Sequence, residues 1–288
     1  MSGYQKPKTR LHREFLYLNS DTVINSLSAF EAGAVDEIIE KVSEAREGGI
    51  EGGVASGLVK VSGGKRKAST VEEALTRSRT NFSAFEGWYR HLKDRDALGT
   101  FTEWDLGTRN DIEVGDTVEF KAHITLAPVQ RMFLTYIDFA NESSNPDSPL
   151  KQPTAKAAEA KKLARMMSGW MKGRGSGKNI MVSIAPLGIG VPRVIARLDE
   201  AYLVGGTQFV EGEFTVIAQV ESLIAQGDAI PAIRVLRDTP PTPKETEIIT
   251  EALQGFIEPA AEFGVEITAD DITLGYPGVI LNAVAIYR

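Results

Sequence analysis

The sequence predicts an α+β protein with mixed, mostly antiparallel sheets flanked by helices. Short runs of β-branched and apolar residues recur along the chain, and amphipathic segments of helical period separate some of them. The regular alternation of strand and helix that builds a parallel sheet is missing. The clearest run, 279–288, is apolar almost to its last residue, so we expect it to lie buried in a sheet. This burial predicts a self-contained folded unit whose last residues belong to the core.

The elements of the first half follow from side-chain period and from capping residues. Apolar residues at helical spacing follow a cap at Ser20 or Asp21, and Thr70 with Glu73 has the pattern of a capping box before a second helix. Apolar and polar residues alternate over 118–124, which indicates a half-buried strand. The predicted strands are 14–18, 58–61, 100–106 and 112–126, and the predicted helices are 20–46, 70–92 and 128–139.

Two subdomains are predicted, with the boundary in a segment of turn-forming residues. Residues 141–153 are rich in Asn, Ser, Asp and Pro, which favour turns and contribute little to a core. The N-terminal α+β subdomain is expected to span 1–145 and to contain a glycine-rich segment at 48–67. The C-terminal α+β subdomain is expected to span 154–288.

The second half is predicted to begin with a basic helix and to continue mainly with strands. A turn around Gly227 joins two apolar runs, which indicates an antiparallel hairpin, and Pro240 and Pro241 then interrupt the chain. The expected strands are 179–185, 193–202, 213–220 and 229–236 with two more at the end of the chain, and the expected helices are 154–172 and 242–263.

The composition excludes several kinds of chemistry. The chain has no cysteine, which excludes disulfides, thiolate nucleophiles and iron–sulfur clusters. Its three histidines, His12, His91 and His123, are too far apart in sequence to form a local zinc motif, so we predict no metal site and no cofactor. No apolar stretch has the length of a membrane span and no signal peptide is recognisable, so the predicted location is the cytoplasm.

Charge is distributed unevenly along the chain. The net charge is −7, yet residues 151–178 contain eight basic residues and a single acid. A basic stripe on an acidic body is typical of a surface that binds nucleic acid or a phosphate-bearing ligand. The candidate residues for such binding are Lys65, Arg66, Lys67, Arg174 and Lys178.

Residues 172–179 match a phosphate-binding loop only in part. Lys172 stands where that motif has glycine, Asn179 replaces its hydroxyl residue, and the expected order is helix then strand instead of the reverse. The simpler interpretation is a flexible glycine-rich exit from the basic helix, whose positive charges suit the negative end of the helix dipole.

The basic helix also carries an apolar face with two adjacent methionines. Met166, Met167 and Trp170 are candidates for contact with a protein partner, because methionine adapts to varied surfaces. The alternatives are packing of this face against the helix's own domain and a position on a membrane surface.

Adjacent carboxylates offer a further possibility, since such pairs can hold a hard cation or act as acid and base. Solvated surface carboxylates are the simpler interpretation. The pairs are Glu103 with Asp105, Asp199 with Glu200, and Asp270 with Asp271.

Three segments of the sequence are similar to a known family. They are the opening 14–19, the middle segment 191–199 followed by 212–220, and the turn at 276–278 that leads into Ala285-Ile286-Tyr287-Arg288. Together they resemble a bacterial and archaeal family of about this length that is catalogued as a domain of unknown function. The resemblance covers nearly the whole chain and carries no catalytic residue. Because families of this kind often occur in mobile-element or anti-phage gene neighbourhoods, it implies antiviral defence as a setting.

These observations lead to three functional hypotheses. The first is a non-enzymatic cytoplasmic binding, regulatory or assembly protein that associates with a protein partner or with itself. The second is a protein that binds nucleic acid or a phosphate ligand through the basic segments 65–67 and 151–178. The third is a carboxylate- or metal-dependent hydrolase, for which no catalytic residue can be named.

Overall fold

The computed structural model describes residues 13–31, 81–172, 178–186, 192–205, 210–236, 242–255 and 257–288. The chain divides into two compact units, one formed by 1–18 together with 98–288 and the other by 19–97. The α+β fold and the mostly antiparallel sheet predicted from the sequence are both confirmed. The glycine-rich segment 48–67, including Lys65, Arg66 and Lys67, lies outside the described residues.

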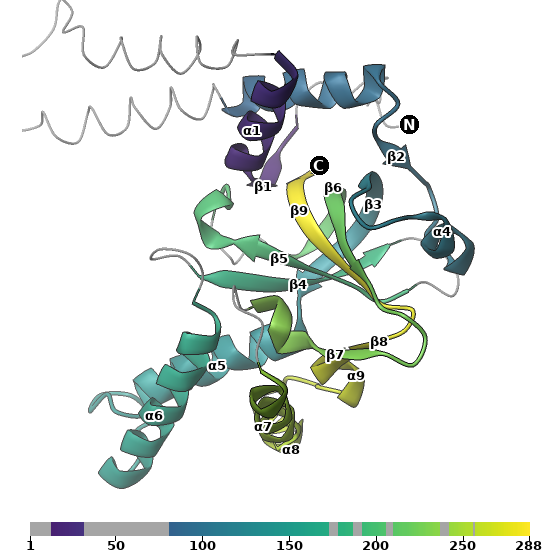
Figure 1. The fold of residues 1–288 in the computed structure, drawn as a ribbon. Coiled ribbons are helices and arrows are strands. Elements are labelled where there is room, and N and C mark those ends of the chain that lie inside the picture. Colours follow the sequence, from purple (N-terminus) through teal and green to yellow (C-terminus); the bar gives the residue numbers. More distant parts are fainter. Residues whose placement is uncertain are drawn as a thin grey trace, which may run out of the picture. The chain divides into compact units, whose positions relative to one another are not determined.

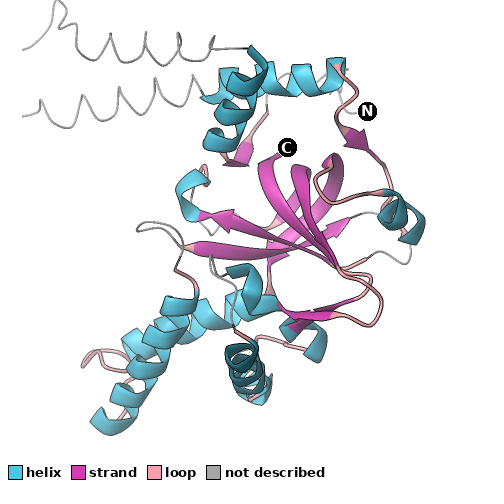
Figure 2. Ribbon diagram, viewed as in Figure 1, coloured by secondary structure: helices cyan, strands magenta, loops and turns pink. Residues whose placement is uncertain are grey.

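Five strands of the larger unit close into a ring (Figures 1 and 2). β3 pairs with β4 and β4 with β5, both antiparallel; β5 pairs with β9 in parallel; β9 pairs with β6 and β6 with β3, again antiparallel. In order around the ring, these strands are β3 (Thr117–Leu126), β4 (Asn179–Pro186), β5 (Val194–Asp199), β9 (Val279–Tyr287) and β6 (Gly212–Leu223). By chain order the ring reads first, second, third, fifth and fourth strand, which is the strand order of an OB-fold barrel.

Two short strands extend the barrel at its edges. β1 (Phe15–Leu18) lies antiparallel to the end of β9, and β2 (Gly99–Thr100) lies parallel to β3. The amide of Glu14 donates to the carbonyl of Arg288, and the amide of Arg288 donates back, at 3.0 and 3.1 Å. β1 was predicted, at 14–18, and these two hydrogen bonds join residues near the two ends of the larger unit.

Alternate residues of the barrel strands fill its interior. On β3 these are Val118, Phe120, Ala122 and Ile124, all nearly inaccessible to solvent. Trp104 is completely buried beside the ring of Phe120, with 4.8 Å between ring centroids. This interior is the first of the two main cores.

A second core forms where helices cover part of the outside of the barrel (Figure 1). Met181, Ile195 and Ile280 point outward from β4, β5 and β9, whereas their sequence neighbours point into the barrel. Two long connections supply the covering elements. Between β3 and β4 these are α5 (Pro128–Glu142) and α6 (Thr154–Trp170), and between β6 and β9 they are β7 (Ala229–Pro231), η3 (Ala232–Leu236), α7 (Pro243–Gln254), α8 (Ile257–Glu262), α9 (Ala269–Ile272) and β8 (Thr273–Gly275).

The smaller unit is helical where it is described. α1 (Ser20–Glu31) begins after Asn19, whose side-chain oxygen accepts from the amide of Thr22 at 3.0 Å. A second helical stretch covers 81–94, and within it the rings of Phe85 and Tyr89 stack 5.7 Å apart. Helices were predicted in both places, although the cap is Asn19 and not one of the two residues after it.

The predicted boundary between two subdomains at 146–153 does not divide the structure. β3 precedes this segment and pairs with β4 and β6, which follow it, so one barrel spans the boundary. The turn-forming residues of 141–153 join α5 to α6, and the amide of Gln152 donates to the carbonyl of Ser143 at 2.8 Å. A turn between packed helices has the same composition as a linker between domains, which explains the error.

Three predicted elements differ in detail. The expected hairpin of 213–220 with 229–236 is wrong, because β7 pairs with β8 and the residues after it form the 3-10 helix η3. The strand expected at 100–106 is only Gly99–Thr100, since Asp105 caps a short helix, α4 (Leu106–Asp111). The last long helix is interrupted, with α7 ending at a C-cap on Gly255.

Candidate functional site

α6 has a fixed inner face that packs on α5 and on the second core. Ala160 and Ala164 lie against Ala140 of α5, and these small side chains let the two helices approach closely. Met167 and Met171 are fully buried at the end of the helix that leads into β4. The remaining faces of α6 are therefore directed toward solvent.

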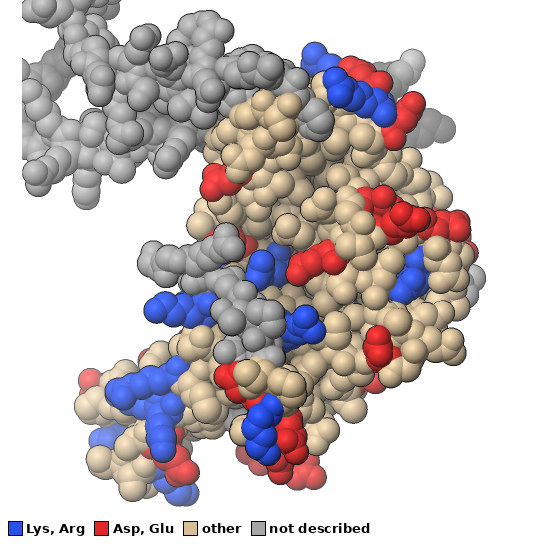
Figure 3. Space-filling model, in the orientation of Figure 1, with Lys and Arg blue, Asp and Glu red and all other residues tan. Residues whose placement is uncertain are grey.

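The outer faces of α6 carry most of its basic residues. Positions 161 and 165 share one side of the helix, because they are four residues apart, and Lys172 follows just after the helix ends at Trp170. Lys162, Arg165 and Lys172 are exposed, and Lys161 is partly exposed. Figure 3 shows Lys and Arg side chains gathered over α6, at the lower left of the view. We call Lys161, Lys162, Arg165, Lys172 and Lys178 the basic surface.

The connection from α6 to β4 places two of these cations side by side. Lys172 and Lys178 form an antiparallel backbone bridge, and the amide of Asn179 donates to the carbonyl of Met171 at 2.7 Å. The predicted residue Lys178 is thus exposed at the end of α6. Arg174, in the segment between the two lysines, lies outside the described residues.

A buried asparagine brings a further cation to this place. The Asn179 side chain is 2% exposed, and its Nδ2 donates to the carbonyl of Leu236 at 2.8 Å, which fixes the end of η3 beside the start of β4. Arg234, two residues earlier on η3, is exposed. Sequence reasoning missed Arg234 because its neighbours in sequence are apolar and the position of η3 beside β4 depends on a contact between residues 57 positions apart.

Among the described residues, the cations at this site form no close ion pairs, although Glu200 lies next to Lys178, since its amide donates to the Lys178 carbonyl at 3.0 Å. Within the described part of the chain, neither the five residues of the basic surface nor Arg234 forms an ion pair or a side-chain hydrogen bond. The one acid of α6, Glu159, lies near Tyr136 of α5, and burial together with the charge of Glu159 raises the pKa of this tyrosine. The positive charges are therefore available to an external anion.

The three residues predicted to contact a partner are divided between core and surface. Met167 is fully buried in the second core, and the ring of Trp170 packs on Phe133 with 5.7 Å between centroids. Only Met166, at 42% exposed, remains at the surface. The apolar face of α6 is therefore occupied mainly by the protein's own core, which was one of the alternatives for this helix.

The carboxylate pairs serve as local caps. Asp105 accepts from the amide of Thr108 at 2.8 Å, and hydrogen bonds from the backbone and side chain of Thr108 lower the pKa of the Asp105 carboxyl. Asp199 accepts from the amide of Ala201 at 2.9 Å at the start of the 3-10 helix η1 (Glu200–Tyr202). Among the described residues, no three His, Asp or Glu side chains are arranged to hold a metal ion.

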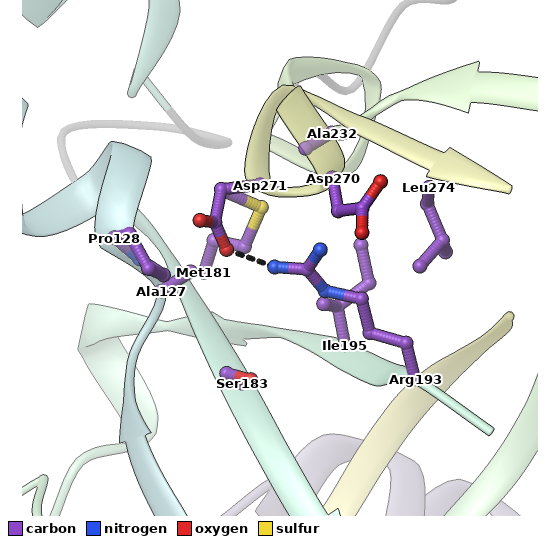
Figure 4. A pocket seen from close by; sticks show the side chains of 10 residues that line it. All are labelled: Ala127, Pro128, Met181, Ser183, Arg193, Ile195, Ala232, Asp270, Asp271 and Leu274. Atoms are coloured by element: carbon purple, nitrogen blue, oxygen red, sulfur yellow. Dashed lines mark hydrogen bonds and ion pairs between the residues drawn. The ribbon is translucent and has the colours of Figure 1, made fainter. Parts of the chain in front are cut away.

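The third pair lines a small pocket on the outside of the barrel (Figure 4). Arg193 forms an ion pair with Asp271, whose other oxygen accepts from the amide and hydroxyl of Thr268 at 2.8 and 2.7 Å. The space open to the centre of a water molecule is about 10 Å³, which suits a single water. The ion pair between Arg193 and Asp271 therefore attaches α9 to the barrel, and the pocket has no room for a substrate.

The comparison with known families agrees with the resemblance seen in the sequence. Residues 12–287 match a family described as a domain of unknown function, DUF6414. The chain belongs to this family. No curated protein and no solved structure matches it. None of the helices that the DUF6414 fold shows within the described residues is long and apolar enough to cross a membrane.

Proposed function

We propose that this protein is a non-enzymatic cytoplasmic binding protein that captures an anionic partner on the basic surface of α6. The observation that carries the proposal is the set of exposed cations on α6 without acidic partners among the described residues. Of the hypotheses from the sequence, the structure favours the anion-binding one over contact through Met166, Met167 and Trp170, because two of these side chains are committed to packing.

Local electrostatics support this choice although the whole chain is acidic. At physiological ionic strength charges are screened beyond about 8 Å, so a partner at α6 experiences the nearby cations more than the distant acids. Residues 151–178 contain eight basic residues and one acid within a chain of net charge −7. The rest of the surface would repel the same partner, which confines binding to this region.

The position of the surface in the fold is consistent with binding. α5 and α6 form the connection between the first and second strands of the barrel. In OB-fold barrels this connection is one of the two that usually contact ligands. This is an analogy of topology alone.

Charge reversal on α6 tests the proposal. We expect the protein to bind heparin and to elute at high salt, and the triple variant K162E/R165E/K172E to elute at much lower salt. The three positions are exposed and lie within or just after the helix, so folding should be retained. The matched control R90E/K121E/K244E changes the net charge equally at exposed sites on other elements.

Comparison of the two variants distinguishes binding by the basic surface from an effect of the total charge of the protein. The control should elute like the parent protein, since its cations are not part of the basic surface. If the parent protein flows through heparin at low salt, or if both variants lose retention equally, the proposal fails. Circular dichroism spectra identical to that of the parent protein would show that the variants are folded.

A further inference from the structure

We propose that the anionic partner is a nucleic acid whose sugar–phosphate backbone runs along α6 and continues over the bridge of Lys172 and Lys178 to Arg234. This inference rests on the proposed function and names the class of partner. Its starting point is that Arg234 extends the basic surface from the helix onto η3.

The cations are distributed along α6 and over the segments that follow it, and are not all on one turn. Within the helix, the rise of about 1.5 Å per residue separates Lys161 from Arg165 by about 6 Å along the axis, and Lys172 follows just after the helix ends at Trp170. The backbone bridge then places Lys178 beside Lys172, and the hydrogen bond from Asn179 to residue 236 brings η3 alongside. A single phosphate would need donors that surround it, whereas a polymer of phosphates matches cations that are distributed in this way.

The chemistry of the surface favours a nucleic acid over a protein. Protein interfaces have apolar or aromatic anchors at their centre and are depleted in lysine. Among the large apolar residues of α6, which the structure describes throughout, Met166 is the exposed one, at 42%, and Trp170 is packed on Phe133. Contacts with phosphates need only positive charge and hydrogen-bond donors, which this surface supplies.

The same surface disfavours a lipid membrane. A helix that lies in a membrane interface inserts its apolar face between the lipids. In α6 that face is occupied, since Ala164, Met167 and the residues around them are buried against α5 and the second core. Lysine and arginine side chains alone would attach the protein only weakly to an anionic membrane, because no apolar face would insert between the lipids.

Binding should depend little on nucleotide sequence. Phosphate contacts fix the position of a nucleic acid but do not read its bases, and a stacking platform requires accessible aromatic rings. The aromatic side chain of α6, that of Trp170, packs against α5. We therefore expect single and double strands of mixed sequence to bind with similar affinity.

Fluorescence anisotropy with labelled single- and double-stranded oligonucleotides tests the proposal. With up to six phosphate contacts, the logarithm of the binding constant should fall with the logarithm of salt concentration with a slope no steeper than about −5 for duplexes and about −4 for single strands. R234A should reduce the steepness by about 0.9 for duplexes and by about 0.7 for single strands. R234K should restore the slope, and R90A, an exposed arginine on another element, should leave it unchanged.

The outcomes distinguish this inference from the proposed function. Retention on heparin without binding to either oligonucleotide would overturn the nucleic-acid assignment and leave anion binding standing. Binding to vesicles that contain phosphatidylserine, without binding to oligonucleotides, would do the same. If R234A leaves the salt slope unchanged, the path over η3 is wrong. Loss of both heparin and oligonucleotide binding would refute both proposals.

Discussion

Two adjacent methionines on α6 should respond to the same substitution with very different losses of stability. Met167 is completely buried in the second core, whereas the next residue toward the N-terminus, Met166, is 42% exposed. Met→Ala at either position leaves the net charge and the helix propensity almost unchanged. The comparison therefore isolates the effect of burial within a single turn of helix.

The expected magnitude follows from the burial of the two side chains. Removing a buried methionine side chain loses roughly 2 kcal/mol of transfer free energy, and the cavity adds to this, so M167A should lower the free energy of unfolding by about 3 kcal/mol. The exposed position should give M166A a change within about 0.5 kcal/mol. In a unit of this size, 3 kcal/mol corresponds to a fall in Tm of roughly 6–12 °C.

Thermal and urea unfolding of both variants, followed by circular dichroism, measure the difference. M166A should also keep the parent protein's heparin elution, because the basic surface does not include it. Equal destabilisation by the two substitutions, or greater loss in M166A, would refute the assignment of these faces. It would return Met167 to the set of candidates for contact with a partner.

Three other changes test the fold around the site. D105A should lower Tm relative to D105N, which retains a cap. The difference in Tm between D105A and the parent protein should be present at neutral pH and shrink as pH falls through the lowered pKa of Asp105, since protonation weakens the hydrogen bonds to its carboxylate. G278A should destabilise the protein, because a Cβ there would lie 2.6 Å from a backbone oxygen, whereas G169A on α6 has open space and should raise the free energy of unfolding by about 0.5 kcal/mol; the reverse order in urea would contradict the packing. Deletion of Ile286–Arg288 should reduce soluble yield and Tm, since it removes the pairs that Ile286 and Tyr287 form with both β1 and β6. A truncated protein that melts like the full chain would show that these contacts contribute little.

Local features of the fold were readable from the sequence. The apolar runs at 14–18 and 279–288 became β1 and β9, and the alternation on β3 became the inner and outer faces of a barrel strand. The helical period predicted α5 closely, at 128–139 against Pro128–Glu142. These predictions succeeded because period and composition depend on residues that are close in sequence.

The same reasoning could not identify which elements meet. Ala229–Pro231 was predicted to pair with the strand before it, but it pairs with Thr273–Gly275, more than forty residues later. The strands around the supposed boundary at 146–153 likewise belong to one barrel. A run of apolar residues shows that a segment will be buried, but it does not specify the partner.

For the candidate site, the sequence located the charge and the structure located its surroundings. By itself the sequence determined that α6 would be a helix, that it would be basic, and that it would have an apolar face, because these properties belong to the residues and their spacing. Only the tertiary structure decided that Met167 is covered while Lys162 and Arg165 are exposed, and that η3, which carries Arg234, lies beside the start of β4. The reason is that the burial of a face depends on distant segments packing against it, and those contacts have no local signature in the chain.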